Sequence, residues 1–156
     1  MANPAQPKAE KRAAQKNQAF PVLVIDDNEA DRRLTAIYLD QAWPFQRDLA
    51  VDFATDGSEV MEKVRHTRFA LLVLDWKMPV MGGSEVLRQL RQRGIRTPVV
   101  VVSGMEREDI PEDLDQLGAG FVNKEYLNAD TLRAAIAHSL RLLGFTQVPT
   151  AKSDTN

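Results

Sequence analysis

Five side chains capable of chemistry lie where apolar, strand-length stretches of the sequence end: Asp26, Asp27, Asp75, Ser103 and Lys124. If these stretches form parallel strands, their carboxyl ends meet at one edge of the sheet, where open α/β sheets bind their ligands. Any one of the five, taken alone, is more often a helix cap or a turn residue than a functional group. Together they predict a binding site.

The three carboxylates determine what such a site would hold. Carboxylates crowded into one crevice repel one another and raise one another's pKa unless a cation lies between them. Mg²⁺ meets this demand, because it accepts a few carboxylates and a carbonyl oxygen, keeps several waters, and leaves a position for a phosphoryl oxygen. The acidic group therefore predicts a divalent cation site.

Asp75 is the predicted reactive group. Residues 69–74, directly before it, are all apolar. A continuous apolar run of strand length is typical of a strand buried on both faces in the middle of a parallel sheet. Pro79, Gly82 and Gly83 follow closely, so the backbone turns away and leaves the carboxylate facing a loop-lined crevice.

The elements that would position these residues alternate between strand and helix. Apolar or alternating runs predict strands over residues 21–25, 49–54, 69–75, 98–102 and 118–123. Helical spacing and caps predict helices over 29–41, from Asp56-Gly57 through Val64, over 84–92, over 111–117, and from Asn128 or Asp130 through Leu143. Because each crossover between parallel strands is right-handed, this order predicts an α/β fold with a doubly wound, five-stranded parallel sheet.

Two of the helices carry more detailed expectations. The first helix, capped by Asn28, is predicted to present one apolar face, made of Ala30, Leu34, Ile37 and Tyr38. The fourth helix is predicted to be short and to begin late. Residues 105–109 are too charged for a good opening turn, whereas Pro111 suits a first helical position.

The chain is predicted to form one domain, residues 20–144, between flexible ends at residues 1–19 and 145–156. Its 156 residues, 44% of them hydrophobic, suit a single core. The first 19 residues carry four basic side chains against one acidic and almost no large apolar residue. We expect this segment to be a solubilising extension rather than an arm that docks a partner, since sparse charge runs are usually just solvated.

Composition excludes several classes of function. A formal charge of −2 predicts no general affinity for nucleic acid. No apolar run approaches the roughly 20 residues that span a bilayer, and the N-terminus lacks the apolar core of a signal peptide. The sequence contains no cysteine, which excludes disulfides, thiolate metal sites and cysteine nucleophiles. We therefore expect a cytoplasmic protein without a membrane partner.

Four groups of residues, each at a predicted strand end, resemble the signature of the receiver domain of two-component response regulators, the CheY-like family: Asp26-Asp27, Asp75 with Met78-Pro79 and Gly82-Gly83, Ser103-Gly104, and Phe121-Val122-Asn123-Lys124. The resemblance spans about residues 20–143. It implies the flavodoxin-like sheet order 2-1-3-4-5.

The resemblance also implies a chemical role for the acidic group. Asp75 would be the phosphoacceptor, attacking a phosphohistidine to form an aspartyl phosphate. Asp27, Asp75 and the backbone carbonyl of Lys77 would ligate Mg²⁺ directly, and Asp26 would act mainly through a bound water. Lys124 and the metal would neutralise charge on the transferring phosphoryl oxygens.

A conformational switch is implied as well. Ser103 would donate its hydroxyl to a phosphoryl oxygen, and Gly104 would leave access to that group open. The added charge would draw Ser103 and Lys124 inward, and Phe121 would turn into the vacated space. This movement would alter a face formed by helix four, strand five and helix five.

Some positions depart from the family pattern. Glu125 follows Lys124 where proline is common, which leaves the placement of the Lys124 ammonium open. Phe121 has no hydroxyl, so a switch there would work by packing alone. Met105 and Lys77 lie beside the site, and their identities would set the lifetime of the phosphoryl group.

The resemblance favours a stand-alone signalling domain rather than an enzyme beyond self-catalysed phosphoryl transfer and autodephosphorylation. Its partners would be a sensor histidine kinase or histidine phosphotransfer protein and an unidentified downstream protein; dimerisation through the fourth and fifth helices is left open. One alternative, an aspartate-nucleophile phosphohydrolase, would need a second Asp two residues after Asp75, where Lys77 stands. A receiver-like binding module that is never phosphorylated is the other alternative. FMN binding is disfavoured because Asp26-Asp27-Asn28 is hostile to a phosphate.

Overall fold

The computed structural model describes residues 19–45 and 48–145 of the chain. They form a five-stranded parallel sheet with the order β2-β1-β3-β4-β5, as predicted. The strands are β1 (Phe20–Ile25), β2 (Leu49–Ala54), β3 (Leu71–Asp75), β4 (Val99–Ser103) and β5 (Ala119–Asn123). The order reverses between β1 and β3, which is where a doubly wound sheet opens a crevice at its carboxyl edge.

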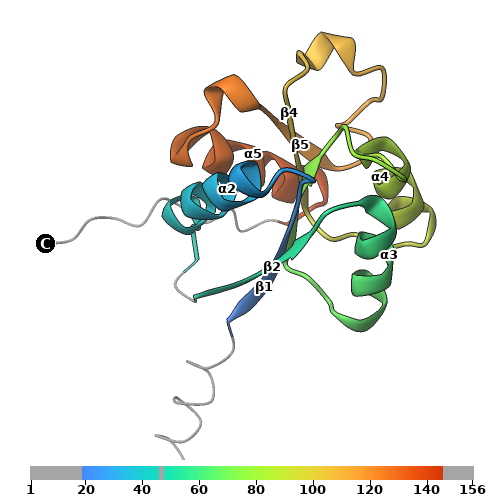
Figure 1. The fold of residues 1–156 in the computed structure, drawn as a ribbon, viewed down its shortest axis with the longest axis horizontal. Helices are drawn as coiled ribbons and strands as arrows, with labels where there is room; N and C mark the ends of the chain where they lie inside the picture. The colour runs from blue at the N-terminus through green and yellow to red at the C-terminus, as the bar shows by residue number, and fades with distance from the viewer. Residues whose placement is uncertain (1–18, 46–47, 146–156) are drawn as a thin grey trace, which may run out of the picture.

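Helices cover both faces of the sheet (Figure 1). The four α-helices of the described residues are α2 (Glu29–Ala42), α3 (Gly57–His66), α4 (Gly83–Gln92) and α5 (Ala129–Leu142). In Figure 1, α2 and α5 lie on one face of the sheet and α3 and α4 on the other. The predicted doubly wound α/β architecture is therefore confirmed.

Alternate residues of each strand supply two separate cores. On β1, Leu23 and Ile25 join the cluster under α3 and α4, whereas Val22 and Val24 join the cluster under α2 and α5. All five residues of β3 are buried, and so are all five of β4. Both faces of these central strands are covered, which explains their continuous apolar sequences.

Side-chain caps fix the starts of the helices. Asn28 accepts the Asp31 N–H at 2.9 Å, as predicted, and Asp56 accepts the Glu59 N–H at 3.0 Å. Asn128 accepts the Thr131 N–H at 2.9 Å, while the Thr131 hydroxyl accepts the Asn128 N–H, which forms a capping box. These caps set where the chain leaves each loop at the carboxyl edge.

The predicted helix over 111–117 is wrong. The connection from β4 to β5 contains a 3₁₀ turn, Arg107–Asp109, and a second single turn that Gly118 ends in the left-handed conformation, at φ 69°. The polar groups of this segment find other partners. Arg107 donates to the carbonyls of Ile110 and Glu112, at 3.0 and 3.1 Å, which ties the backbone into an irregular path instead of a helix.

The predicted apolar face of the first helix is also wrong. Leu34 and Ile37 are 45% and 56% exposed, Ala30 is exposed too, and only Tyr38 of the predicted face is partly buried. Buried residues of α2 are instead Thr35, Leu39 and Ala42, which follow the same i, i+4, i+7 spacing on another side. Because α2 packs beside α5 as well as on the sheet, the neighbouring elements determine which stripe is inward.

The predicted flexible ends lie almost entirely outside the described residues, which begin at Ala19 and end at Phe145. Within the described part of the chain, none of the helices has the length and apolar character needed to cross a membrane.

Candidate functional site

The carboxyl edge of the sheet collects the predicted acidic residues. Asp26 and Asp27 follow the last residue of β1, and Asp75 is the last residue of the neighbouring strand β3. One carboxylate oxygen from each of the three lies within 4.8 Å of the others. Asp26 and Asp75 are buried, at 4% and 6% exposure, while Asp27 is exposed. The cluster is therefore open to solvent on the Asp27 side.

This donor set fits a small divalent cation. In octahedral coordination, Mg²⁺ holds oxygen ligands at about 2.1 Å, so neighbouring ligands lie about 3 Å apart and opposite ones about 4.2 Å. The three carboxylate oxygens, which lie within 4.8 Å of one another, would move closer together to bind one ion. Two buried carboxylates without a cation between them would also repel each other strongly. The predicted Mg²⁺ site therefore agrees with the geometry and with the charge.

Lys124 reaches into the same cluster. Its Nζ lies 3.0 Å from Asp26 Oδ2 and 3.5 Å from Asp75 Oδ2. It also lies 3.2 Å from Asp31 Oδ2. The ammonium is thus directed at the predicted phosphoacceptor although Glu125 follows it. With four carboxylates and one ammonium, the site remains acidic enough to attract a divalent cation.

The pKa values reflect this balance. Burial, followed by the negative charge of Asp26, raises the pKa of Asp75 to about 6, against the opposing charge of Lys124. Burial also disfavours the charged form of Lys124, but its hydrogen bond to Asp26 and the charge of Asp75 outweigh this effect and raise its pKa. The lysine therefore stays charged, and Asp75 is a carboxylate for which a nearby cation would be strongly favourable.

The loop after Asp75 folds back against the end of β3. The Lys77 backbone N–H lowers the pKa of the Asp75 carboxyl slightly, while the role of the Lys77 carbonyl as a metal ligand stays a prediction. Gly83 donates to the Trp76 carbonyl at 2.9 Å, and a Cβ on Gly83 would lie 2.6 Å from the Asp75 carbonyl oxygen. The start of α4 can approach the site this closely only because residue 83 is glycine. Val80, in the same loop, is 86% exposed and has a positive φ of 68°.

Ser103 ends β4, beside β3, and is 1% exposed. Its oxygen accepts the Met105 N–H at 3.1 Å. The hydroxyl acts as an acceptor in this bond, so its proton stays available for another acceptor. Gly104 is exposed, with nothing within 4 Å of where a Cβ would lie. These positions are compatible with the expected roles of both residues, which stay predictions.

Phe121 lies on β5, opposite Val101 of β4. Its side chain is partly buried and packs against the cluster on the α3 and α4 side of the sheet. That is the side on which the irregular connection between β4 and β5 contributes Ile110 and Leu114 to the core. A rotation of Phe121 would therefore change the packing of this connection. The sequence had predicted a fourth helix in its place.

Three further residues organise the site, and the sequence analysis did not assign them. Asp31 binds Lys124, and Arg32 Nη1 donates to the Asp26 carbonyl at 2.8 Å. Both belong to the first turn of α2. Their position a few residues after the Asp26-Asp27 pair is the sequence feature that could have identified them. Asn123, 7% exposed, accepts the Glu125 N–H and donates to the Met105 carbonyl, at 2.9 and 3.3 Å. It links the backbone that carries Lys124 to the backbone next to Ser103.

Two curated relatives share sequence with this chain. A protein-glutamate methylesterase/protein-glutamine glutaminase of Treponema denticola is 30% identical over 140 residues, which are 79% of this chain and 34% of the relative. The autoinducer 1 sensor kinase/phosphatase LuxN of Vibrio campbellii is 30% identical over 110 residues, 69% of this chain and 12% of the relative. The chain therefore spans only a minor part of the length of either protein.

Solved structures agree with the fold. The chemotaxis response regulator CheY4 of Vibrio cholerae has a TM-score of 0.64 at 25% identity, covering 79% of this chain and all of that one. The receiver domain of a Francisella response regulator has a TM-score of 0.60 at 26% identity, covering 81% and 98% of the two chains. Residues 22–137 match the family model described as the response regulator receiver domain. Because this match extends over most of its length, the chain belongs to the response regulator receiver domain family.

Proposed function

We propose that this chain is a cytoplasmic response regulator that accepts a phosphoryl group on Asp75 in a magnesium-dependent reaction. The donor is a phosphohistidine on a histidine kinase or on a histidine phosphotransfer protein. The observation that carries the proposal is the arrangement around Asp75. Its buried carboxylate lies within 4.8 Å of the Asp26 and Asp27 oxygens and 3.5 Å from the Lys124 ammonium.

The residues of the site have separate parts in this transfer. An Asp75 oxygen attacks the phosphorus, an oxygen–phosphorus bond forms, and the phosphorus–nitrogen bond to the donor histidine breaks. Lys124 holds a positive charge where the phosphoryl oxygens arrive, and Ser103 offers its hydroxyl proton to one of them. Asp26, Asp27 and Asp75 would hold a Mg²⁺ ion, which would supply further charge neutralisation.

The output is a rearrangement of the connection between β4 and β5. The phosphorylated aspartate carries about −1.5 to −2 charges in place of one, and it gains acceptor oxygens. Lys124 then shifts from Asp31 and Asp26 toward the new charge. The Ser103 hydroxyl turns toward the phosphoryl group, and this rotation breaks its bond with the Met105 N–H. The rest of the 104–118 connection moves with Met105, and Phe121 packs on the same side of the sheet as this connection. The signalling face is therefore residues 104–118 with β5 and α5.

The phosphohydrolase alternative has less support. Such an enzyme protonates its leaving group with an acid two residues after the nucleophile. That position is Lys77, whose side chain is exposed. Among the described residues, the acidic side chains grouped with Asp75 and Lys124 are Asp26, Asp27 and Asp31, and these three are engaged with the cation site or with Lys124.

The test is phosphorylation by a small donor. The parent protein and Asp75→Asn are incubated with Mg²⁺ and either acetyl phosphate or phosphoramidate, and the intact masses are measured. We expect the parent to gain one phosphoryl mass and Asp75→Asn to gain none. We also expect chelation of the metal to prevent the gain in the parent, because the carboxylate cluster then repels the incoming phosphoryl oxygens.

Asp40→Asn is the matched control, because Asp40 is an exposed carboxylate on α2 outside the site. It should gain the same mass as the parent. An unchanged mass gain in Asp75→Asn would show that another residue is the acceptor. Continuous release of phosphate at an enzyme's pace would favour the phosphohydrolase.

A further inference from the structure

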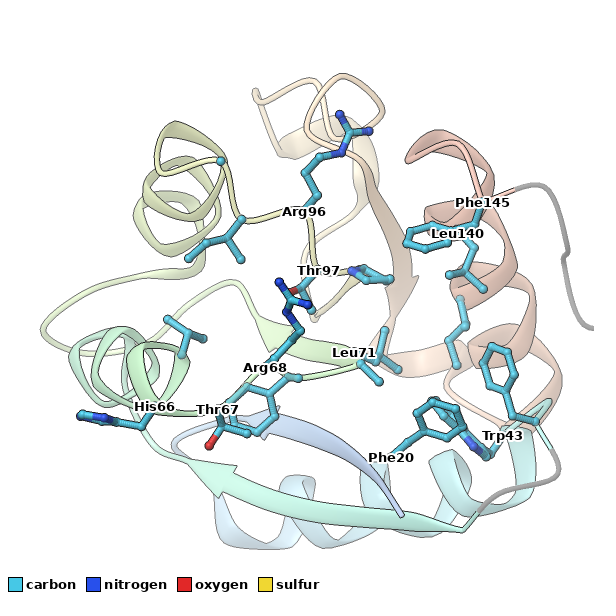
Figure 2. A pocket seen from close by; sticks show the side chains of 18 of the residues that line it. Phe20, Trp43, His66, Thr67, Arg68, Leu71, Arg96, Thr97, Leu140 and Phe145 are labelled. Atoms are coloured by element: carbon cyan, nitrogen blue, oxygen red, sulfur yellow. The ribbon is translucent and has the colours of Figure 1, made fainter. Parts of the chain in front are cut away.

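A cavity of about 850 Å³ lies at the opposite edge of the sheet, where the strands begin (Figure 2). Phe20, at the start of β1, and Leu71, at the start of β3, both line it. Asp75 is four residues further along β3 than Leu71, which corresponds to about 13 Å. The phosphoryl site therefore does not use this cavity, and nothing in the proposed phosphoryl transfer requires it.

One wall of the cavity is aromatic. Phe20, Trp43 and Phe45 pack against one another with ring centroids 5.0 to 5.6 Å apart. Leu71 and Leu140 extend the same apolar lining. Small-molecule sites have this character, with mostly apolar and aromatic walls, a few polar groups, and volumes of roughly 300–1,000 Å³.

The charged groups of the lining favour one sign. Three arginines line the cavity, Arg65, Arg68 and Arg96, and its described lining contains no aspartate or glutamate. Arg65 pairs with Glu62 at 3.5 Å, and Arg96 donates to the Leu143 carbonyl at 3.0 Å. Arg68 has no hydrogen bond or ion pair with any described residue. In Figure 2 its guanidinium points toward the middle of the view, whereas that of Arg96 lies near the edge.

The aromatic wall also contains an unsatisfied donor. The indole Nε1 of Trp43 is buried and has no hydrogen-bond partner among the described residues, and the residue is only 4% exposed. Leaving a buried N–H without a partner is costly, and native proteins rarely do so without a reason. Because this nitrogen is buried, a ligand in the cavity would contact the ring of Trp43 and not its N–H, so Trp43 contributes apolar surface to the site.

We propose that this cavity binds a small amphiphilic anion, namely an apolar molecule that carries a carboxylate. The apolar body lies against Phe20, Trp43 and Phe45, and the carboxylate forms a paired, charge-assisted hydrogen bond with the Arg68 guanidinium. The positive charge of the three lining arginines selects an anion over a neutral or cationic molecule. The concave shape and the aromatic wall suit a small molecule better than a flat protein surface.

The test uses the two tryptophans as reporters. The full chain, labelled with ¹⁵N, gives two indole N–H signals, which Trp43→Phe assigns. Dodecanoate, kept below its micelle concentration, is the probe, and dodecylamine is its cationic counterpart. We expect dodecanoate to shift the Trp43 signal saturably and to leave that of Trp76, at the phosphoryl edge, in place. Dodecylamine should leave both signals in place.

Two variants test the assignment of the charge. Arg68→Glu should weaken dodecanoate binding by about tenfold or more, the value of one lost charge-assisted hydrogen bond. Arg68 is exposed and unpaired within the described part of the chain, so this variant should fold and accept a phosphoryl group normally. Arg93→Glu is the matched control, because Arg93 is exposed, lies outside the lining, and carries the same charge. It should bind dodecanoate as the parent does.

Four results would overturn the proposal. One is equal binding of dodecanoate and dodecylamine, and another is equal weakening by Arg68→Glu and Arg93→Glu, since either would mean general adsorption. The third is binding only after removal of residues 1–18 or 146–156, which would identify an end of the chain as the occupant. If an acidic amphipathic peptide shifts the Trp43 signal and dodecanoate does not, the site takes a protein segment and the proposal is wrong.

Discussion

Strands β4 and β5 are covered in two different ways on their two faces. On one face, the 14-residue helix α5 packs directly on β5, with Leu132, Ala135 and Ile136 buried against it. On the other face, the connection of residues 104–118 buries Ile110 and Leu114 in the core, with Met105 and Leu117 partly buried against it, and contains no α-helix. The first face is held by close apolar packing, and the second mainly by side chains that bond to backbone carbonyls.

This difference matters for a switch. Regions with few buried apolar contacts and many exposed polar bonds open at lower cost than packed helices. On this face, 104–118 is held by bonds from Arg91, Arg107 and Glu112, all of which water can reach in part. We therefore expect this connection, rather than α5, to move when Asp75 is modified. The following predictions test the contrast through the free energy of unfolding.

The largest effect is expected at Gly120, in the middle of β5. A Cβ there would clash with the carbonyl oxygen of Ala135 on α5 and lie 2.9 Å from its carbonyl carbon. We expect Gly120→Ala to lower the free energy of unfolding by about 3 kcal/mol, because backbone must move to make room. Denaturant unfolding measures this. Gly104→Ala, with nothing within 4 Å of its Cβ, is the control and should be nearly neutral. Equal effects would mean that α5 is not tightly packed.

Ser139 provides the next test of the α5 face. It is fully buried, its oxygen accepts the Val99 N–H at 3.1 Å, and its hydroxyl donates to the Gly118 carbonyl at 2.8 Å. Ser139→Ala leaves both buried backbone groups without a partner, so we expect a loss of about 2.5 kcal/mol in thermal or denaturant unfolding. Ser58→Ala, which removes an exposed hydroxyl, should change stability little. A loss at Ser139 no larger than this control would contradict the prediction.

Arg91 tests the opposite face. Its guanidinium donates to the carbonyls of Leu117, Ile95 and Thr97 at 2.6, 2.8 and 2.9 Å. Burial, with a contribution from Arg96, lowers the pKa of this guanidinium to about 10. We expect Arg91→Met to cost about 2 kcal/mol, because the lost bonds are partly offset by removal of a buried charge and by water. Arg93→Met is the control, because Arg93 directly follows the same helix and its side chain is exposed. Hydrogen exchange should rise in residues 104–118 of Arg91→Met, and an equal rise in α5 would contradict the contrast.

The sequence predicted those parts of the molecule that depend on local signals. Strand ends follow from apolar runs, and Asn28 and Asp56 identify two helix starts because a cap bonds within its own first turn. The grouping of Asp26, Asp27 and Asp75 follows from parallel topology alone. The positions of these residues were therefore predictable without knowledge of any long-range side-chain contact.

The errors lie where distant parts of the chain decide. Leu34 and Ile37 have helical spacing, but so do Thr35 and Leu39, and only the position of α5 selects between the two stripes. Pro111 suits the start of a helix, yet Glu112 bonds to Ser84 and Arg88, 28 and 24 residues away. Asp31 binds Lys124 from 93 residues away. Such contacts leave no periodic pattern in the sequence.

The smallest effect, and the one specific to pH, is expected at Glu112, the acidic anchor of the 104–118 connection. The Ser84 hydroxyl, 2.5 Å away, lowers the pKa of Glu112 below its ordinary value of 4.5, against partial burial and with help from Arg88. Because the folded pKa is the lower one, this carboxylate stabilises the protein above pH 4.5, and the contribution is lost as the pH falls through the folded pKa. We expect Glu112→Gln to be less stable than the parent by about 1 kcal/mol at pH 7, and equally stable in acid. When Ser84→Ala is already present, adding Glu112→Gln should change the free energy of unfolding much less. A difference that persists unchanged into acid would show that Glu112 acts by shape and not by charge, and that the connection is packed like the α5 face.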